Sequence, residues 1–265
     1  MTTPFVPPGR VWADLPGSAI PAVTSERSLA VVPVGAIEHH GPHLPLRTDA
    51  LIAERVAAAA VARAASEGID AWLLPTITIS KSDEHHWAPG TLWIEGTTLL
   101  DQLVQLGQSL RITPVRTVVF VNGHGGNVAL LGWANRELRR RFGLRSFAMP
   151  AGIVPAGDGT DGSPDERGQG IHAGWAETSL VMHLAPELVS PDLPPRNVPE
   201  RIAGMRHIGF NGRPVTFGWT SDDFGPTGVI GDPTGATAAA GAALFDRGVA
   251  FVAEALAEID GFEFA

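Results

Sequence analysis

Short apolar runs and longer segments of helical periodicity alternate along the chain. Continuous apolar runs predict strands at residues 29–34, 71–79, 116–121 and 146–153. Apolar residues recur at helical spacing in residues 49–67, 97–113 and 128–142, from just after residue 172 to about 185, and in the alanine-rich residues 237–259. Because strands that alternate with helices form parallel βαβ units, we predict an α/β fold with a parallel β-sheet, in which residues 1–265 make one domain.

A dense polar segment follows the first predicted strand and contains Glu38, His40 and Asp49. Glu38 and His40 project to the same side of an extended backbone, and a glycine and two prolines before Asp49 favour a turn that brings it back. Two carboxylates and an imidazole suit a divalent cation such as Zn²⁺ or Mn²⁺. The alternative is a polar surface loop with solvated histidines. Asp49 is also expected near a helix N-terminus, where a carboxylate is favourable, and both roles are compatible.

A glycine-rich turn, Asn-Gly-His-Gly-Gly-Asn at residues 122–127, follows the third predicted strand. Active sites of parallel sheets gather outside the carboxyl ends of the strands, so His124 is placed to join the other three residues as a metal ligand. The alternative is that the turn cradles a phosphate on its backbone amides. The turn has no Lys or Arg and no GxGxxG or GKS/T pattern, which favours the metal.

The segment His-Ala-Gly-Trp-Ala-Glu-Thr-Ser at residues 172–179 opens a predicted helix. His172 and Glu177 can both reach inward from this helix start, and Glu177 is then a fifth candidate ligand. The alternative is that Glu177 is an ordinary carboxylate of a first helical turn and His172 a surface imidazole.

Other residues are candidates for binding a substrate. Glu84 and His86 lie in the polar loop at residues 80–91, where a pocket-lining role and a purely structural one are equally open. Trp175 and Trp219 are candidates to wall the pocket, and filling the core is the alternative for each tryptophan.

Composition narrows the class of protein. The net charge of −9 and the absence of a basic stripe disfavour nucleic acid or an anionic membrane as the main partner. The chain has no cysteine, so any metal is held by His, Asp and Glu. The N-terminus lacks the pattern of a signal peptide, and the apolar residues 51–65 are too short and too charged to span a bilayer. We therefore expect a soluble cytoplasmic protein.

Three motifs, at residues 38–49, 122–127 and 172–179, resemble in this order those of the creatininase (creatinine amidohydrolase) family, and residues 84–91 and 228–234 are similar to it as well. The resemblance implies a parallel sheet with helices on both faces, an α/β/α sandwich. It also implies two Zn²⁺ and/or Mn²⁺ ions per chain, hydrolysis of a C–N amide bond and a homo-oligomer, often a hexamer. The implied ligands are Glu38, His40, Asp49 and His124, with Asp49 bridging the two ions.

The sequence departs from creatininase itself at one position. There a glutamate two residues after the histidine of the glycine-rich turn is a further ligand, whereas this chain has Gly126. Glu177 is therefore our candidate to complete the second metal site. His172 is the favoured acid/base, with Glu177 as the other candidate to pass a proton to the leaving nitrogen.

The leading prediction is a metal-dependent amidohydrolase acting on a small cyclic or linear amide, through water activated by the two ions. Similar motifs in the family occur in peptidase-like members associated with mycofactocin maturation, and a deformylase or a lactone hydrolase needs the same chemistry. The alternatives outside this class are a metal-binding protein without turnover and a nucleotide-binding α/β protein that uses the glycine-rich turn.

Overall fold

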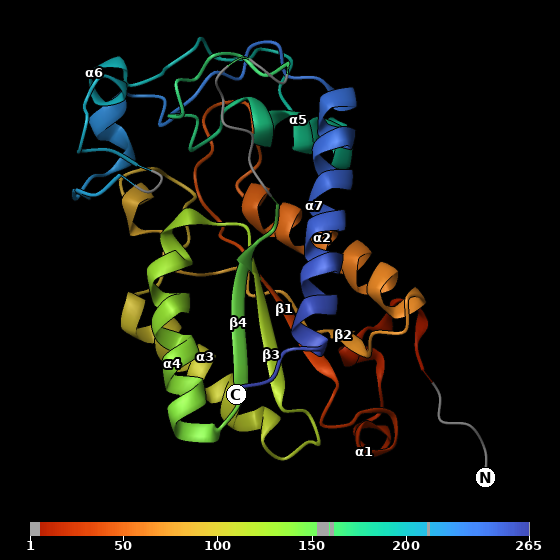
Figure 1. Cartoon of the computed structure of the whole chain (residues 1–265). Helices are drawn as coiled ribbons and strands as arrows, with labels where there is room; N and C mark the ends of the chain where they lie inside the picture. The colour runs from red at the N-terminus through yellow and green to blue at the C-terminus, as the bar shows by residue number, and fades with distance from the viewer. Residues whose placement is uncertain (1–5, 153–158, 160–161, 211–212, 265) are drawn as a thin grey trace.

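The computed structural model describes residues 6–152, 159, 162–210 and 213–264 of the chain (Figure 1). Its sheet has four parallel strands in the order β2-β1-β3-β4. They are β1 (Leu29–Val34), β2 (Ala71–Leu73), β3 (Thr117–Asn122) and β4 (Arg145–Pro150). The central strands β1 and β3 pair along their whole length and end together, with Val34 opposite Asn122. The segments that follow these two strands therefore leave the sheet at the same edge.

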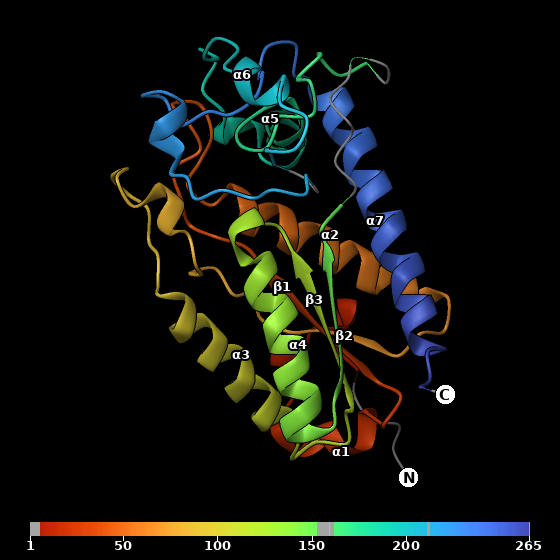
Figure 2. The same cartoon turned by 60° about the vertical axis from the view of Figure 1, so that its left-hand side comes forward.

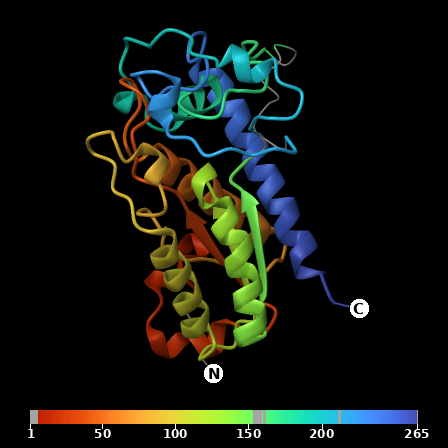
Figure 3. The same ribbon diagram turned by 90° about the vertical axis from the view of Figure 1, so that its left-hand side faces the viewer.

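Helices cover both faces of the sheet, as predicted. Helices α2 (Thr48–Ser66) and α7 (Ala238–Asp260) lie on one face, and α3 (Gly96–Leu110) and α4 (Val128–Phe142) lie on the other (Figure 2). Figure 3 shows the green α4 and the blue α7 on opposite sides of β4.

Successive strand residues supply the two cores that these helices cover. Leu29, Val31, Val119 and Val121 pack toward α2 and α7, whereas Ala30, Val32, Val118 and Phe120 pack toward α3 and α4. Burying one Val or Leu side chain contributes roughly 1.5–3 kcal/mol, so the two cores hold the strand ends in fixed positions.

A further layer lies beyond the carboxyl ends of the strands (Figure 1). It contains α5 (Trp175–Leu184), which packs against α7 and α2, and the short α6 (Glu200–Ala203). The short α1 (Ile20–Val23) precedes β1 at the other end of the sheet. Within the described residues, no helix combines the length and hydrophobicity that crossing a membrane requires.

The predicted element boundaries differ from the structure where proline intervenes. The predicted strand 71–79 is wrong beyond Leu73, because Pro75 has no N–H to continue the ladder, and only an isolated bridge joins Ile77 to Val34. Helix α3 ends at Leu110, shortly before Pro114. The predicted fourth strand, residues 146–153, ends at Pro150 instead of continuing through residues 151 and 152, and residue 153 lies outside the described residues.

Candidate metal centre

Two glycines allow the start of α2 to pack directly on the ends of β1 and β3. A Cβ on Gly35, after β1, would lie 2.4 Å from the Cα of Ala50. A Cβ on Gly123, after β3, would lie 2.5 Å from the carbonyl oxygen of Asp49. The absence of both side chains brings Asp49 between the two strand ends, beside the segments that carry Glu38 and His124.

The predicted ligands form two triplets that share Asp49. In the first triplet (Glu38, Asp49 and His124), His124 Nδ1 lies 3.2 Å from Glu38 Oε2 and 3.0 Å from Asp49 Oδ2. In the second triplet (His40, Asp49 and Glu177), His40 Nε2 lies 3.0 Å from Asp49 Oδ1 and 3.9 Å from Glu177 Oε2. The ligand atoms of each triplet lie within 4.8 Å of one another, as the ligands of one metal ion require.

Main-chain carbonyl groups orient the histidines of the two triplets. Nδ1 of His40 lies 3.2 Å from the carbonyl oxygen of Glu38, and Nε2 of His124 lies 3.0 Å from that of Lys81. A carbonyl oxygen only accepts hydrogen bonds, so each of these nitrogens carries hydrogen. The other nitrogen of each ring faces the carboxylates, which is the arrangement that metal-binding histidines need.

Buried polar atoms at the centre of the cluster have unmet bonding capacity. Among the described residues, Glu38 Oε1 is buried and forms no hydrogen bond, and the buried His40 Nε2 lies 3.0 Å from Asp49 Oδ1 without good hydrogen-bond geometry. Such groups are rare in proteins because burying them without a partner is costly. A divalent cation fits these residues, since it would satisfy the atoms and match the hard carboxylate and imidazole donors.

The charges of the cluster also favour a cation. Burial opposes the charged form of His40, but Asp49, Glu177 and Glu38 outweigh it and raise the pKa of His40 to about 10. Burial likewise opposes ionisation of Asp49, yet His40 and His124 lower the pKa of its carboxyl group. Without metal, protons on the histidines therefore supply the positive charge that the carboxylates require, and a cation would replace them.

His172 lies outside the two triplets that share Asp49, but with Glu38 and His40 it forms a third group whose ligand atoms also lie within 4.8 Å of one another. Its Nδ1 is 3.6 Å from Glu38 Oε1, and its ring stacks on that of His40 with the centroids 4.2 Å apart. Burial and the neighbouring His40 and His85 keep the pKa of His172 well below its ordinary value. A neutral imidazole in this position can accept a proton.

Glu177 projects from the first turn of α5, as expected from the sequence. Its Oε2 accepts a hydrogen bond of 2.5 Å from the N–H of Ala173. Burial raises the pKa of Glu177 to about 7, although His40 acts in the opposite direction. Its proton therefore leaves near neutral pH, where the carboxylate becomes available as a ligand.

The loop after β2 forms a wall of the cluster that sequence reasoning described only in part. The hydroxyl of Ser82 donates to Glu38 Oε2, and the ring of His85 stacks on that of His172 at 4.2 Å. His86, the predicted residue, is exposed and its Nδ1 lies 2.9 Å from the carbonyl oxygen of Asp83. The 3₁₀ turn η4 (Asp83–His85) directs His85 rather than His86 toward the cluster.

The other predicted substrate-binding residues have varied surroundings. Trp175 is buried, and its Nε1 donates to the carbonyl oxygen of Gly235. Trp219 packs edge-on against Phe210 and Phe224, in an aromatic cluster of the region between α5 and α7. Glu84 is buried next to His124. A substrate-binding role for these residues and for His86 stays a prediction.

Glu166 is a buried carboxylate that the sequence did not single out. Its Oε1 accepts hydrogen bonds from the N–H groups of Asp232 at 2.6 Å and Trp175 at 3.4 Å. A Cβ on Gly174 would lie 2.5 Å from the same oxygen. Glu166 thus connects the residues around His172 with the segment before α7. These contacts join positions far apart in sequence, so no local sequence pattern predicts them.

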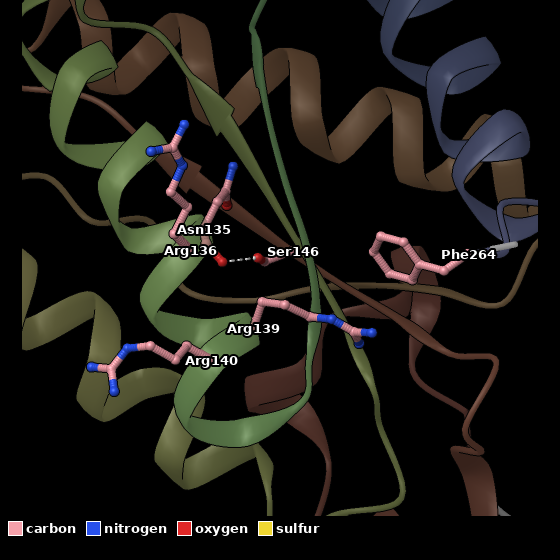
Figure 4. A pocket seen from close by; sticks show the side chains of 6 residues that line it. All are labelled: Asn135, Arg136, Arg139, Arg140, Ser146 and Phe264. Atoms are coloured by element: carbon pink, nitrogen blue, oxygen red, sulfur yellow. Dashed lines mark hydrogen bonds between the residues drawn. The ribbon is translucent and has the colours of Figure 1, made fainter.

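A shallow pocket elsewhere on the surface is lined by Asn135, Arg136, Arg139, Arg140, Ser146 and Phe264 (Figure 4). These residues lie on α4, at the start of β4 and near the C-terminus. The ligand triplets follow the opposite, carboxyl ends of the strands, so this pocket is separate from the candidate metal centre.

Comparisons with known proteins agree with the motifs and the fold. Residues 13–256 match the creatininase family model, described as creatinine amidohydrolase. The chain is 37% identical over 245 residues to the mycofactocin precursor peptide peptidase of Mycobacterium tuberculosis (strain ATCC 25618 / H37Rv), covering 87% of each chain. It is 31% identical over 183 residues to the creatinine amidohydrolase of Pseudomonas putida, covering 61% of this chain and 66% of that protein.

A solved creatininase variant described as Zn-Zn type has the same fold, with a TM-score of 0.69 and 22% identity, covering 94% of this chain and 97% of the other. The family match spans most of the chain and includes the residues of both triplets. The chain therefore belongs to the creatininase (creatinine amidohydrolase) family of metal-dependent hydrolases.

Proposed function

We propose that this protein is a two-metal amidohydrolase that cleaves a C–N amide bond. The observation that carries the proposal is the position of Asp49, whose Oδ1 and Oδ2 each lie 3.0 Å from a different histidine, His40 and His124. One carboxylate thus belongs to both triplets, as a residue that bridges two ions must. Glu38 and His124 would complete the first metal site, and His40 and Glu177 the second.

The ions that we propose are Zn²⁺ and Mn²⁺. Carboxylate and imidazole donors suit both. The creatininase variant described as Zn-Zn type and a creatininase described as Mn support this choice. When bound, a pair of such ions lowers the pKa of water and polarises a carbonyl group.

His172 is the proposed acid/base. Its Nε2–H is held by the carbonyl oxygen of His39, which leaves the Nδ1 lone pair facing Glu38 and the triplets. The neutral ring would take a proton from the attacking water at Nδ1 and give it to the leaving nitrogen as the C–N bond breaks, a contribution of roughly 10²–10⁴ in rate. Glu177 is proposed as a ligand rather than as the proton carrier, because its Oε2 faces His40.

The substrate class that we favour is a peptide. The similarity to the mycobacterial peptide peptidase extends over more of this chain than the similarity to the creatinine amidohydrolase. A small cyclic or linear amide, predicted from the sequence, is the second candidate and is supported by the latter relative. Both substrates present an amide carbonyl and a leaving nitrogen, so the proposed roles of the residues are the same.

The test is to load the purified protein with Zn²⁺ or Mn²⁺ and to measure new amino groups, with products identified by mass spectrometry. One panel contains short peptides with free and blocked ends, and the other contains creatinine and related cyclic amides. Cleavage of peptides that requires the ions and is lost in Asp49→Asn supports the proposal. Turnover of small amides alone would favour the second candidate, and two bound ions without turnover of any amide would contradict the proposed function.

Assembly and location are proposals that rest on the family resemblance and on composition. A hexamer would have about six times the mass of one chain, and analytical ultracentrifugation measures this mass directly. The cytoplasmic location likewise stays a prediction.

A further inference from the structure

Glu84 lies next to a candidate ligand but belongs to neither triplet. Its side chain is buried, and its Oε1 lies 3.3 Å from Nε2 of His124. Its Oε2 accepts a hydrogen bond of 2.9 Å from Nζ of Lys81. The carboxylate is therefore held between a lysine of its own loop and the histidine that follows β3.

Gly126 leaves open the space that this carboxylate occupies. A Cβ on Gly126 would lie 2.3 Å from Glu84 Oε1, closer than any stable contact. Gly126 does not have a positive φ, so its backbone conformation alone does not call for glycine. A Cβ there would also lie 2.5 Å from His124 Nε2 and 2.9 Å from the carbonyl oxygen of Lys81, so the lack of a side chain at this position is explained by Glu84, His124 and Lys81 together.

Two acceptors converge on the same nitrogen of His124. Nε2–H donates to the carbonyl oxygen of Lys81 at 3.0 Å and also faces Glu84 Oε1. The opposite nitrogen, Nδ1, is thereby directed at the carboxylates of the first triplet. Carboxylates behind metal-binding histidines fix the ring orientation and increase the basicity of the ligand nitrogen.

We propose that Glu84 is a positioning residue for the first metal site. Its carboxylate accepts a hydrogen bond from Lys81 and occupies the space beside Gly126. It holds the ring of His124 so that Nδ1 meets an ion bound by the first triplet. The inference rests on the proposed two-metal function, but it concerns the binding of the ion and not the reaction. In this arrangement the carboxylate of Glu84 is committed to Lys81 and His124 rather than to a substrate.

The experiment is a titration of the metal-free protein with Mn²⁺ alone, in which electron paramagnetic resonance measures the free ion. We expect Glu84→Ala to weaken one of the two sites by about 10- to 100-fold and to leave the other unchanged. Glu84→Gln should restore most of the affinity, because an amide oxygen still accepts from Nε2–H. The exposed Glu187→Gln is the matched control, and circular dichroism with thermal unfolding verifies that each variant is folded.

A second variant, Gly126→Ala, should weaken the same site, because the new methyl group would displace Glu84 and crowd His124. Wild-type Mn²⁺ affinity in Glu84→Ala would overturn the inference, as would a Glu84→Gln variant that binds as weakly as Glu84→Ala. Failure to bind Mn²⁺ in the wild type would overturn it together with the proposed function. If the wild type binds two ions and cleaves no amide while Glu84→Ala loses one site, the proposed function fails and this inference is supported.

Discussion

The carbonyl oxygen of His39 lies 2.7 Å from Nε2 of His172. Because a carbonyl only accepts, this contact fixes the hydrogen of His172 on Nε2 and leaves Nδ1 free on the side of the triplets. The residue that orients the proposed acid/base is thus the chain neighbour of His40, a candidate ligand. The position of the proposed proton acceptor is therefore tied to the proposed second metal site through a single peptide unit.

His172→Ala should lower amide hydrolysis by about 10²- to 10⁴-fold, because the group that carries the proton is removed. The ion content should not change, because the proposed ions are held by the two triplets that share Asp49; loss of an ion would instead identify the third group, Glu38, His40 and His172, as a metal site. Steady-state rates and elemental analysis of the same sample measure the two effects. His207→Ala, at an exposed position, is the control, and a wild-type rate for His172→Ala would refute the assigned role.

Asp49→Asn should abolish binding of both ions, because the two triplets share this carboxylate. Asp101→Asn removes an exposed carboxylate from α3 and should leave the ion content unchanged. Elemental analysis after gel filtration compares the two variants with the wild type, and thermal unfolding verifies their fold. An Asp49→Asn protein that retains two ions would rule out the shared site.

Glu166 should make stability depend on pH. Burial raises the pKa of its carboxyl group, with Asp232 acting in the same direction, while the N–H groups of Asp232 and Trp175 and the charge of Arg196 oppose the shift. A carboxyl pKa that is higher in the folded than in the unfolded state means that stability is lost as pH rises through the folded pKa. Glu166→Gln keeps an acceptor for these N–H groups but does not ionise.

The free energy of unfolding of Glu166→Gln, measured with urea, should therefore increase relative to that of the wild type as pH rises above about 4.3, the ordinary pKa of a glutamate. Glu187→Gln, at an exposed position, should show no such trend. A constant difference between Glu166→Gln and the wild type across pH 4 to 8 would contradict a raised pKa for Glu166.

Gly35→Ala should destabilise the fold and the metal centre together. The added Cβ would meet the backbone of Ala50 at 2.4 Å, and relieving this clash costs roughly 1–3 kcal/mol. The shift would also carry Asp49 away from the strand ends, so ion affinity should fall. In Gly132→Ala the Cβ meets open space on α4, and this variant should be stabilised by about 1 kcal/mol. Equal stability of the two variants in urea unfolding would show that the contact at Gly35 is not tight.

The sequence predicted the fold best where its pattern was unbroken. Strand β1 and helix α4 have the expected bounds because their apolar pattern is continuous, and β1 keeps its pairing with β3 although it contains Pro33. Strand β2 is short because Pro75 removes a donor, which an apolar pattern does not register. The α/β architecture with helices on both faces and the family itself are confirmed.

The candidate site was predictable where its residues lie in recognisable motifs, including His124 and Glu177, which are distant in sequence from Asp49. Glu38, His40 and Asp49 are close along the chain, so their spacing indicated a common site. Whether His85 or His86 faces the cluster depends on one short 3₁₀ turn, and the sequence around two adjacent histidines has no periodic pattern that predicts it. Glu166 depends on a contact with Asp232, 66 residues away, which only the folded chain brings about.

The two proposed ion sites depend on different segments of the chain, because only the second uses α5, which packs against α7. The first triplet is complete by residue 124, on the strand ends and α2 alone, whereas the second needs Glu177 from α5. If α7 no longer packed against α5, Glu177 would not be held in place, and the chain would bind one ion at the first triplet instead of two. The number of ions bound per chain would then report whether the two ends of the sequence have come together.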